Sequence, residues 1–483
     1  TLVGADAYSK ALDLYFDRHD GQAVTTDDFF AAMTDANDVD FAQFKRWYSQ
    51  AGTPVLDVSG VYDEAAKAFR LHVRQSCPET PGQKDKEPFL IPLKMALLGQ
   101  SGEALPLQLA DEKSSQGSSR TLQVDAAEQS FTFINVPVAP VPSLLRDFSA
   151  PVKLHYLYSR EGLAFLFAND SDSFNRWEAG QRLATDVMLE MIADIREKRK
   201  PAVKEVFLTA FRSALTDRDA DPALLALALT LPGEMELAEA MSIADPGAIH
   251  AARQALRNIL AEELQDEFTA VMAVMQDKGL YSLAPEAIGR RSLKNLCLGY
   301  LTLLDKPEMQ KLCFEQFVEA DNMTDRMAAL TCLVHNALPK WEEALAAIYH
   351  QFQDDPLVVD KWFSLQATSP MPETLVKVHE LMEHPAFTMR NPNRVRALVG
   401  AYAHGNPARF HDLSGAGYVF VADRVLELDG LNPQVAARMV APLSRWRRYD
   451  DKRQSLMRAQ LERIQGQENL SADVGEIVQK SLN

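Results

Sequence analysis

The fold of this chain changes at the segment FKRWYSQAGTP, residues 44–54. Phe44 and Trp47 recur there at the spacing of one helical face. Gly52 and Pro54 follow, and a glycine at the stop with a proline soon after is typical of a helix C-terminus. Apolar and polar residues alternate directly after the segment. We therefore predict that it ends a helical region and opens a β-region.

Residues 1–52 are predicted to form three short amphipathic helices. Asp6 is the expected N-cap of the first helix, Thr25 or Thr26 caps the second, and the third follows Asp40. About fifty residues bury little surface by themselves, so these helices need a partner to pack against. We expect that partner upstream of the first residue, which is not a methionine.

Residues 53–152 are predicted to form a β-sandwich, because about seven short alternating strands occur there with turn-rich clusters between them. Pro92 and Pro106 fall inside predicted strands, which indicates sheet edges or bulges at both positions. His72 has no evident partner in the sequence and is interpreted as an ordinary strand histidine. The strands are expected around residues 55, 69–73, 89–97, 105–109, 122–124, 131–133 and 152–156.

Residues 153–483 are predicted to be helical. Three Asp-Pro pairs, at 221–222, 245–246 and 355–356, indicate helix starts, with an aspartate N-cap and proline at the first helical position. The helices are modest in length and show no strict sequence period, which favours an irregular, solenoid-like array of paired helices. The predicted fold class is therefore multidomain α+β.

Composition narrows the possible partners. The 483 residues carry a net charge of −17, which disfavours nucleic acid and anionic membranes as partners. No apolar run reaches the ~18 residues of a membrane-spanning helix, and no coiled-coil seam is evident, so we expect a monomer without membrane attachment. Cys77, Cys297, Cys313 and Cys332 form no C-x-x-C pair, which suits free thiols in a reducing compartment, the cytoplasm.

No reaction centre is recognisable in the residues themselves. A helical zinc-peptidase motif needs two histidines one turn apart with a glutamate between them. The nearest pair here, His379 and His384, is five residues apart, which places the two rings ~140° apart around a helix. Gly-x-Ser-x-Gly, P-loop and dinucleotide motifs do not occur. We therefore predict no catalytic residue and no metal ligand in this chain.

Basic residues concentrate near the C-terminus, and two interpretations stay open. Most such residues form solvated helix faces that offset nearby acids, but one or two arginines could instead turn into the concave face of the array to meet an anion. The residues are Arg438, Arg445, Arg447, Arg448, Lys452, Arg453, Arg458 and Arg463.

Several short motifs resemble the aminopeptidase N family of gluzincin zinc peptidases. The segment WYSQAGTP resembles the end of that family's catalytic domain, and APVKL at 150–154 its exit from the sandwich. Further similar motifs occur in the family's order over the helical region: NMTD at 322–325, DKWF at 360–363, ATSP at 367–370, FTM at 387–389, NPNRVR at 391–396, NPQVAAR at 432–438 and RYD at 448–450.

This resemblance implies a zinc-dependent aminopeptidase that removes N-terminal amino acids from peptides. The family's H-E-x-x-H helix, distal glutamate, G-A-M-E-N strand and transition-state tyrosine are missing, so the resemblance implies that zinc is bound upstream and not by this segment. Residues 1–52 would then end a thermolysin-like catalytic domain, 53–152 would be the sandwich, and 153–483 a cap that restricts substrate access. In the family, arginines matching Arg396 and Arg438 line the substrate cavity, so both are expected to bind substrate.

Two other functions stay open at this point. One is a non-catalytic helical-repeat scaffold that binds protein or peptide partners, and the other is a hydrolase with an unrecognised site. Sequence upstream of the first residue would separate them, because H-E-x-x-H there would establish the peptidase. The preference for the residue that is removed is not encoded in any motif found here.

Overall fold

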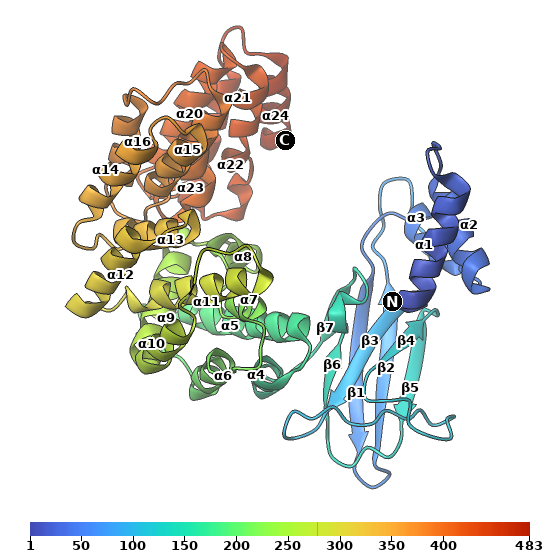
Figure 1. Ribbon diagram of the computed structural model, residues 1–483. Helices are drawn as coiled ribbons and strands as arrows, with labels where there is room; N and C mark the ends of the chain where they lie inside the picture. The colour runs from blue at the N-terminus through green and yellow to red at the C-terminus, as the bar shows by residue number, and fades with distance from the viewer. Residues whose placement is uncertain (278) are drawn as a thin grey trace. The chain divides into compact units, whose positions relative to one another are not determined.

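The computed structural model describes residues 1–277 and 279–483 (Figure 1). The chain divides into two compact units, Thr1–Leu183 and Ala184–Asn483. The boundary falls inside one helix, α5 (Ser173–Arg196), which begins in the first unit and ends in the second.

The first unit opens with short helices: α1 (Ala5–His19), α2 (Thr26–Asn37), the 3₁₀ turn η1 (Gln43–Lys45) and α3 (Arg46–Ser49). Thr25, one of the two predicted candidates, is the N-cap of α2, and its backbone N–H donates to the Asp28 carboxylate at 2.8 Å in a capping box. The N-cap predicted for α1, Asp6, was wrong. Its N-cap is Gly4, with φ of 81°, and Asp6 lies in the first helical turn, where a carboxylate still favours the positive end of the helix dipole.

The predicted β-sandwich is confirmed. One sheet has the strand order β5-β2-β1-β7 and the other β4-β3-β6, and apolar side chains from both sheets form a single buried core (Figure 1). All ladders are antiparallel except the parallel pair of β1 with β7. The strands are β1 (Val55–Asp63), β2 (Ala68–Ser76), β3 (Ile91–Leu98), β4 (Arg120–Val124), β5 (Glu128–Phe133), β6 (Val141–Leu144) and β7 (Lys153–Tyr156).

Two details of the sandwich differ from the sequence prediction. Residues 105–109 form no strand, although Leu105 and Leu107 are buried in the core. Strand β6 was not predicted, because it is short and carries Pro142. Pro92 lies in β3 opposite β4, whereas β6 pairs with β3 only from residue 95 to 98. The missing N–H of Pro92 therefore falls where β3 has one neighbour, as expected for an edge position.

A buried charge cluster joins the sandwich to the first helices that follow it, α4 (Arg160–Asn169) and the start of α5. The Arg146 guanidinium donates to Ser171 Oγ at 2.7 Å and lies 3.6 Å from the Asp170 carboxylate and 3.7 Å from that of Asp172. The Asp170 side chain is 0% exposed, and burial raises its pKa. Asp147, which has a left-handed φ of 55°, donates its N–H to Asp172 at 2.9 Å. The cluster thus holds a strained backbone segment against the helices.

The second unit is an array of helices, as predicted, in which most helices pack against a neighbour in the sequence. Asp221, Asp245 and Asp355 are N-caps followed by proline, and each accepts one or two hydrogen bonds from backbone N–H groups of the first helical turn. The helices of its first half are α6 (Glu205–Leu215), α7 (Pro222–Ala228), α8 (Glu234–Glu239), α9 (Pro246–Glu263), α10 (Gln265–Val274), α11 (Pro285–Leu301), α12 (Pro307–Glu319), α13 (Met323–His335), α14 (Trp341–Phe352) and α15 (Pro356–Ala367). The remaining elements are α16 (Thr374–Met382), α17 (Pro392–Val395), the π-helical turn η3 (Arg396–Gly400), α18 (Ala401–Gly405), α19 (Pro407–Phe410), α20 (Ala416–Asp429), α21 (Pro433–Met439), α22 (Ala441–Ser444), the 3₁₀ turn η4 (Trp446–Arg448), α23 (Asp451–Gln465) and α24 (Ala472–Leu482).

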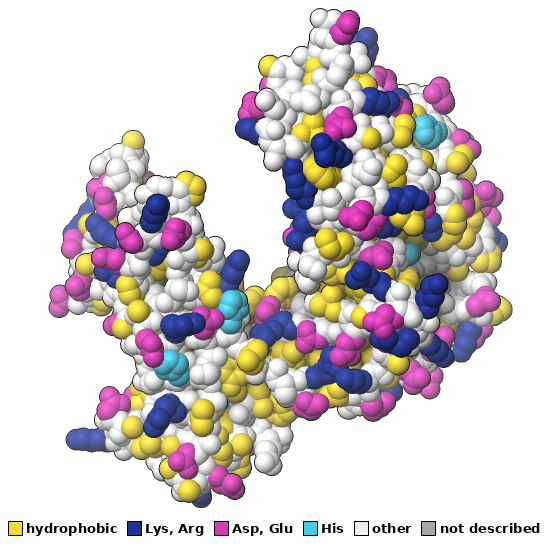
Figure 2. Space-filling view, turned by 180° about the vertical axis from the view of Figure 1, so that it is seen from behind, with side chains coloured by type: hydrophobic (Ala, Val, Ile, Leu, Met, Phe, Trp, Pro, Cys, Tyr) yellow, Lys and Arg dark blue, Asp and Glu magenta, His cyan; other side chains and the backbone are white. Residues whose placement is uncertain are grey.

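The surface carries both signs of charge. On the face that Figure 2 shows, Lys and Arg side chains alternate with Asp and Glu instead of forming one large patch of either sign. All four cysteines are free thiols. Over the described residues, no helix combines the length and the apolar composition that crossing a membrane requires.

Candidate functional sites

The structure offers no metal centre within the part of the chain that it describes. No three His, Cys, Asp or Glu side chains there lie close enough together to hold an ion. His379 lies on α16 with its ring 4.9 Å from that of Phe420, whereas His384 lies beyond the end of α16 and packs 4.8 Å from Tyr349. The two histidines therefore do not share a site.

A polar groove runs along the second unit. It consists of three adjoining cavities of about 490, 400 and 530 Å³, all of which have His335 in their walls. We call it the His335 groove. Helix α9 contributes His250 and Arg257, the C-terminal ends of α13 and α15 contribute His335 and Thr368, and Arg396 lies in the last cavity.

His335 is a neutral hydrogen-bonding group in this groove. Burial lowers its pKa, and the nearby Arg257 cation lowers it further, although the Leu365 carbonyl opposes the shift. Its Nε2 lies 3.0 Å from that carbonyl, so Nε2–H is the donor and Nδ1 is left as an acceptor. The histidine therefore adds polarity to the groove without a charge.

Arg396, one of the two arginines expected to bind substrate, lies in the groove and is exposed. It begins the π-helical turn η3, a local widening of the helix that is frequent at functional sites. Its Nη2 donates to Asn393 Oδ1 at 3.0 Å, and it forms no ion pair with any described carboxylate. Lys361, which the sequence analysis did not single out, lies in the same cavity. This end of the groove therefore presents two cations to a ligand, together with the Asp360 carboxylate, which pairs with Arg394.

Arg438, the other predicted substrate-binding residue, is exposed on α21. It does not line the His335 groove, so the structure does not bring it into one cavity with Arg396. Within the described residues its side chain makes neither a hydrogen bond nor an ion pair, whereas its backbone carbonyl accepts from the Val440 N–H. Its guanidinium is therefore available, but on another surface of the array.

Most of the other C-terminal arginines have structural partners. Arg448 donates to the carbonyls of Ala238 at 2.9 Å and Met241 at 3.0 Å, at the end of α8. Arg453 is 8% exposed and donates to the His411 carbonyl at 2.8 Å. Ion pairs to nearby acids also hold Arg445, Arg458 and Arg463. These contacts fit the interpretation as charge-balanced helix faces.

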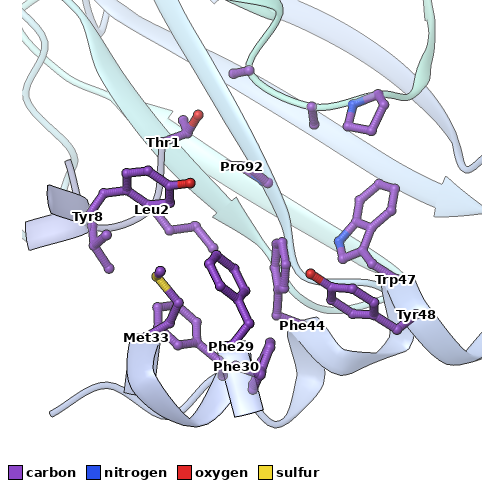
Figure 3. A pocket seen from close by; sticks show the side chains of 15 residues that line it. Thr1, Leu2, Tyr8, Phe29, Phe30, Met33, Phe44, Trp47, Tyr48 and Pro92 are labelled. Atoms are coloured by element: carbon purple, nitrogen blue, oxygen red, sulfur yellow. The ribbon is translucent and has the colours of Figure 1, made fainter. Parts of the chain in front are cut away.

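The first unit contains an apolar pocket of about 440 Å³ beside the 44–54 segment. Figure 3 shows aromatic side chains from α1, α2 and the 44–54 segment around it, with Pro92 from strand β3. Trp47 fixes this arrangement, because its Nε1–H donates to the Leu90 carbonyl at 3.0 Å and its ring lies 4.9 Å from that of Phe89. Tyr48 is 55% exposed at the rim. An apolar pocket with aromatic walls is suited to contact with another protein segment.

Comparison with known protein families gives two matches, one to the sandwich and one to the helical array. Residues 52–157 match the family described as "Domain of unknown function (DUF3458) Ig-like fold", and residues 160–483 match "Domain of unknown function (DUF3458_C) ARM repeats". Both descriptions agree with the sandwich and the helical array.

The whole chain is 42% identical to aminopeptidase N of Escherichia coli and 41% identical to that of Haemophilus influenzae, and in each case it covers 55% of the relative. The Caulobacter vibrioides aminopeptidase N is 42% identical, with 54% covered. A crystal structure of Legionella pneumophila aminopeptidase A in complex with aspartic acid matches with a TM-score of 0.81 and 31% identity, over 100% of this chain and 55% of that one. The chain thus spans about 55% of the length of the relatives it matches.

Proposed function

Because this chain belongs to the aminopeptidase N family and matches the C-terminal part of its members, we propose that it supplies the C-terminal domains of a zinc-dependent aminopeptidase. The observation that carries the proposal is the 42% identity over the full chain. The motif resemblance drawn from the sequence is thereby confirmed. The whole enzyme would hydrolyse N-terminal amino acids from peptides.

The zinc site of that enzyme would lie on residues that this chain does not contribute, since the family's H-E-x-x-H motif does not occur in its sequence. Residues 1–52 would complete a thermolysin-like catalytic domain. The apolar pocket supports this role, because its aromatic walls at α1, α2 and the 44–54 segment offer a surface for the rest of that domain.

The helical array would cover the active-site chamber and restrict access to short or unfolded peptides. Arg396 and Arg438 would attract the carboxylate or main-chain carbonyls of a bound peptide. Their exposure and their lack of an ion pair with any described carboxylate support this assignment. We further propose a monomer in the cytoplasm, where the four thiols would stay reduced.

A fragment-complementation experiment tests the proposal. The chain is mixed with a separately produced fragment of E. coli aminopeptidase N that contains everything upstream of the matched region. We expect a complex that hydrolyses alanine p-nitroanilide only with zinc, and no stoichiometric zinc in the 483-residue chain alone. Stoichiometric zinc and hydrolysis by the chain alone would overturn the assignment. Failure to bind the fragment would favour the non-catalytic scaffold instead.

A matched pair of variants tests the docking role of the pocket. Tyr48→Asp places a charge at the pocket rim, whereas Phe16→Asp places one on a side chain of similar exposure (55% and 57%) that does not line the pocket. We expect Tyr48→Asp to weaken complex formation at least ~10-fold, because a carboxylate would be desolvated at the interface, and Phe16→Asp to have a smaller effect. Equal effects of the two variants would contradict docking at this pocket.

A further inference from the structure

The middle cavity of the His335 groove contains two arginines that form no ion pair with its walls. Arg253 and Arg257 lie one turn apart on the same face of α9, and both line this cavity of about 400 Å³. Neither forms an ion pair with any described carboxylate. Like charges at this spacing repel each other, so the helix alone gives no reason for the pair.

Each guanidinium is oriented by carbonyl or amide oxygens that leave other N–H groups free. Arg253 donates through Nε to the Pro232 carbonyl at 3.0 Å. Arg257 donates through Nη2 to the Gly299 carbonyl at 3.1 Å and through Nη1 to Gln254 Oε1 at 2.9 Å. Because a guanidinium has five N–H donors, both residues keep donors for a ligand. These neutral partners fix the side chains without neutralising them.

One carboxylate lies in the walls of this cavity, and it contacts a histidine instead of the two arginines. Glu234 is the one carboxylate in the walls of this cavity, and it lies 2.7 Å from His250 Nδ1. Burial lowers the pKa of His404, which also lines the cavity, so its ring is neutral. Burial, and next the Arg253 cation, lower the pKa of Arg257, as expected for a desolvated cation that lacks an anion. A bound anion would offset both the desolvation of Arg257 and its repulsion by Arg253.

We propose that Arg253 and Arg257 form a carboxylate-binding site that holds the C-terminal carboxylate of a short peptide lying in the His335 groove. The planar fork of a guanidinium matches the two oxygens of a carboxylate. The adjoining cavities share His335, and the outer one presents Arg396 and Lys361, so an extended peptide has room and polar contacts along the groove. The anion site stands on this geometry alone, whereas the choice of a peptide rests on the proposed function.

Isothermal titration of the chain with N-acetyl-Ala-Ala, with its C-terminal amide and with inorganic phosphate tests the proposal. We expect the free acid to bind at least ~10-fold more tightly than the amide, because the amide lacks the charge that a guanidinium pairs with. Equal binding of acid and amide, or no binding of either, would overturn the site. Binding of phosphate without the free acid would overturn the peptide assignment.

Variants assign the effect to the arginines. Arg253→Gln and Arg257→Gln should each remove the preference for the acid, and Arg253→Lys should keep part of it. Arg212→Gln is the control, since Arg212 on α6 also donates to a carbonyl, that of Glu263, but pairs with Glu267 and does not line the groove. Thermal unfolding of each variant shows whether it is folded. A preference that survives in folded Arg253→Gln and Arg257→Gln would refute the assignment. The titration needs no hydrolysis, so its result is independent of the complementation experiment.

Discussion

Replacing Lys294 by methionine should destabilise the helical unit strongly. The Lys294 ammonium on α11 lies 2.7 Å from the Asp325 carboxylate at the start of α13, and both side chains are only 6% exposed. Asn322 and Asn295 also donate to that carboxylate, at 3.0 and 2.9 Å. Methionine has a similar length but no charge, so the substitution leaves the carboxylate buried without a cation.

The expected loss of unfolding free energy follows from the burial of this ion pair. Removing one partner of a buried ion pair costs ~3–5 kcal/mol, because the remaining charge is desolvated and uncompensated. The two asparagine amides still stabilise the carboxylate, so we expect the lower end, ~3 kcal/mol. For a unit of this length, Ala184–Asn483, that corresponds to a fall in Tm of ~5 °C.

Thermal and urea unfolding, followed by circular dichroism, measure this loss. Lys311→Met is the control, because Lys311 is 74% exposed in an ion pair with Glu315 and should cost under ~0.5 kcal/mol. The double variant Lys294→Met, Asp325→Asn should recover part of the loss, since it leaves no buried charge. If Lys294→Met cost no more than Lys311→Met, the reasoning about burial would be refuted.

Trp47→Ala should cost ~2–4 kcal/mol, because it removes aromatic packing and the hydrogen bond to the Leu90 carbonyl; urea unfolding measures this, and a cost below ~0.5 kcal/mol would contradict it. Burial lowers the pKa of His411 from 6.5 to about 3, so the unfolded chain binds a proton in this range that the folded chain does not. Stability should therefore be full above ~pH 6.5 and fall by up to ~1.4 kcal/mol per pH unit towards pH 3, with a flatter profile for His411→Gln in urea titrations at several pH values. In the complemented enzyme, Arg396→Ala and Arg438→Ala should each raise KM for short peptides ~5–30-fold, equivalent to ~1–2 kcal/mol, and an unchanged KM across peptide lengths would argue against substrate binding by that residue.

Local signals in the sequence predicted local structure well. The aspartate caps of α7, α9 and α15 were predicted because the cap, the proline and the helix start are adjacent in the chain. The N-cap of α2, predicted at Thr25 or Thr26 and found at Thr25, was predicted from the same kind of local signal. Alternation in the β-region predicted the sandwich because it reports which side chains are buried.

Alternation does not report which backbone groups are paired. Leu105 and Leu107 alternate and are buried, yet their N–H groups bond to the carbonyls of Leu97 and Gly117, which belong to no common ladder. Strand β6 shows the converse, because its pairing with β3 comes from the tertiary structure and not from its own pattern.

The candidate sites were harder to predict for the same reason. Arg396 was singled out through the family resemblance, whereas Arg253 and Arg257 look in the sequence like any pair of basic residues on a solvated helix face. What distinguishes them is that neither forms an ion pair with a described carboxylate. Which groups surround an arginine depends on loops and helices that are distant in sequence. Their i, i+4 spacing was the one available signal, since like charges at that spacing suggest a ligand or a partner.

The charge cluster at Arg146 has a consequence for anyone building chimaeras from this family. A crossover at residue 160, where the residues matched by one family begin, would take Arg146 and Asp170 from different parents. The buried Asp170 carboxylate would then lose the cation that lies beside it. A crossover within α5, after Leu183, keeps donor and acceptor on the same parent and interrupts only a regular helix. Modular exchange should therefore succeed at the second position and yield insoluble protein at the first.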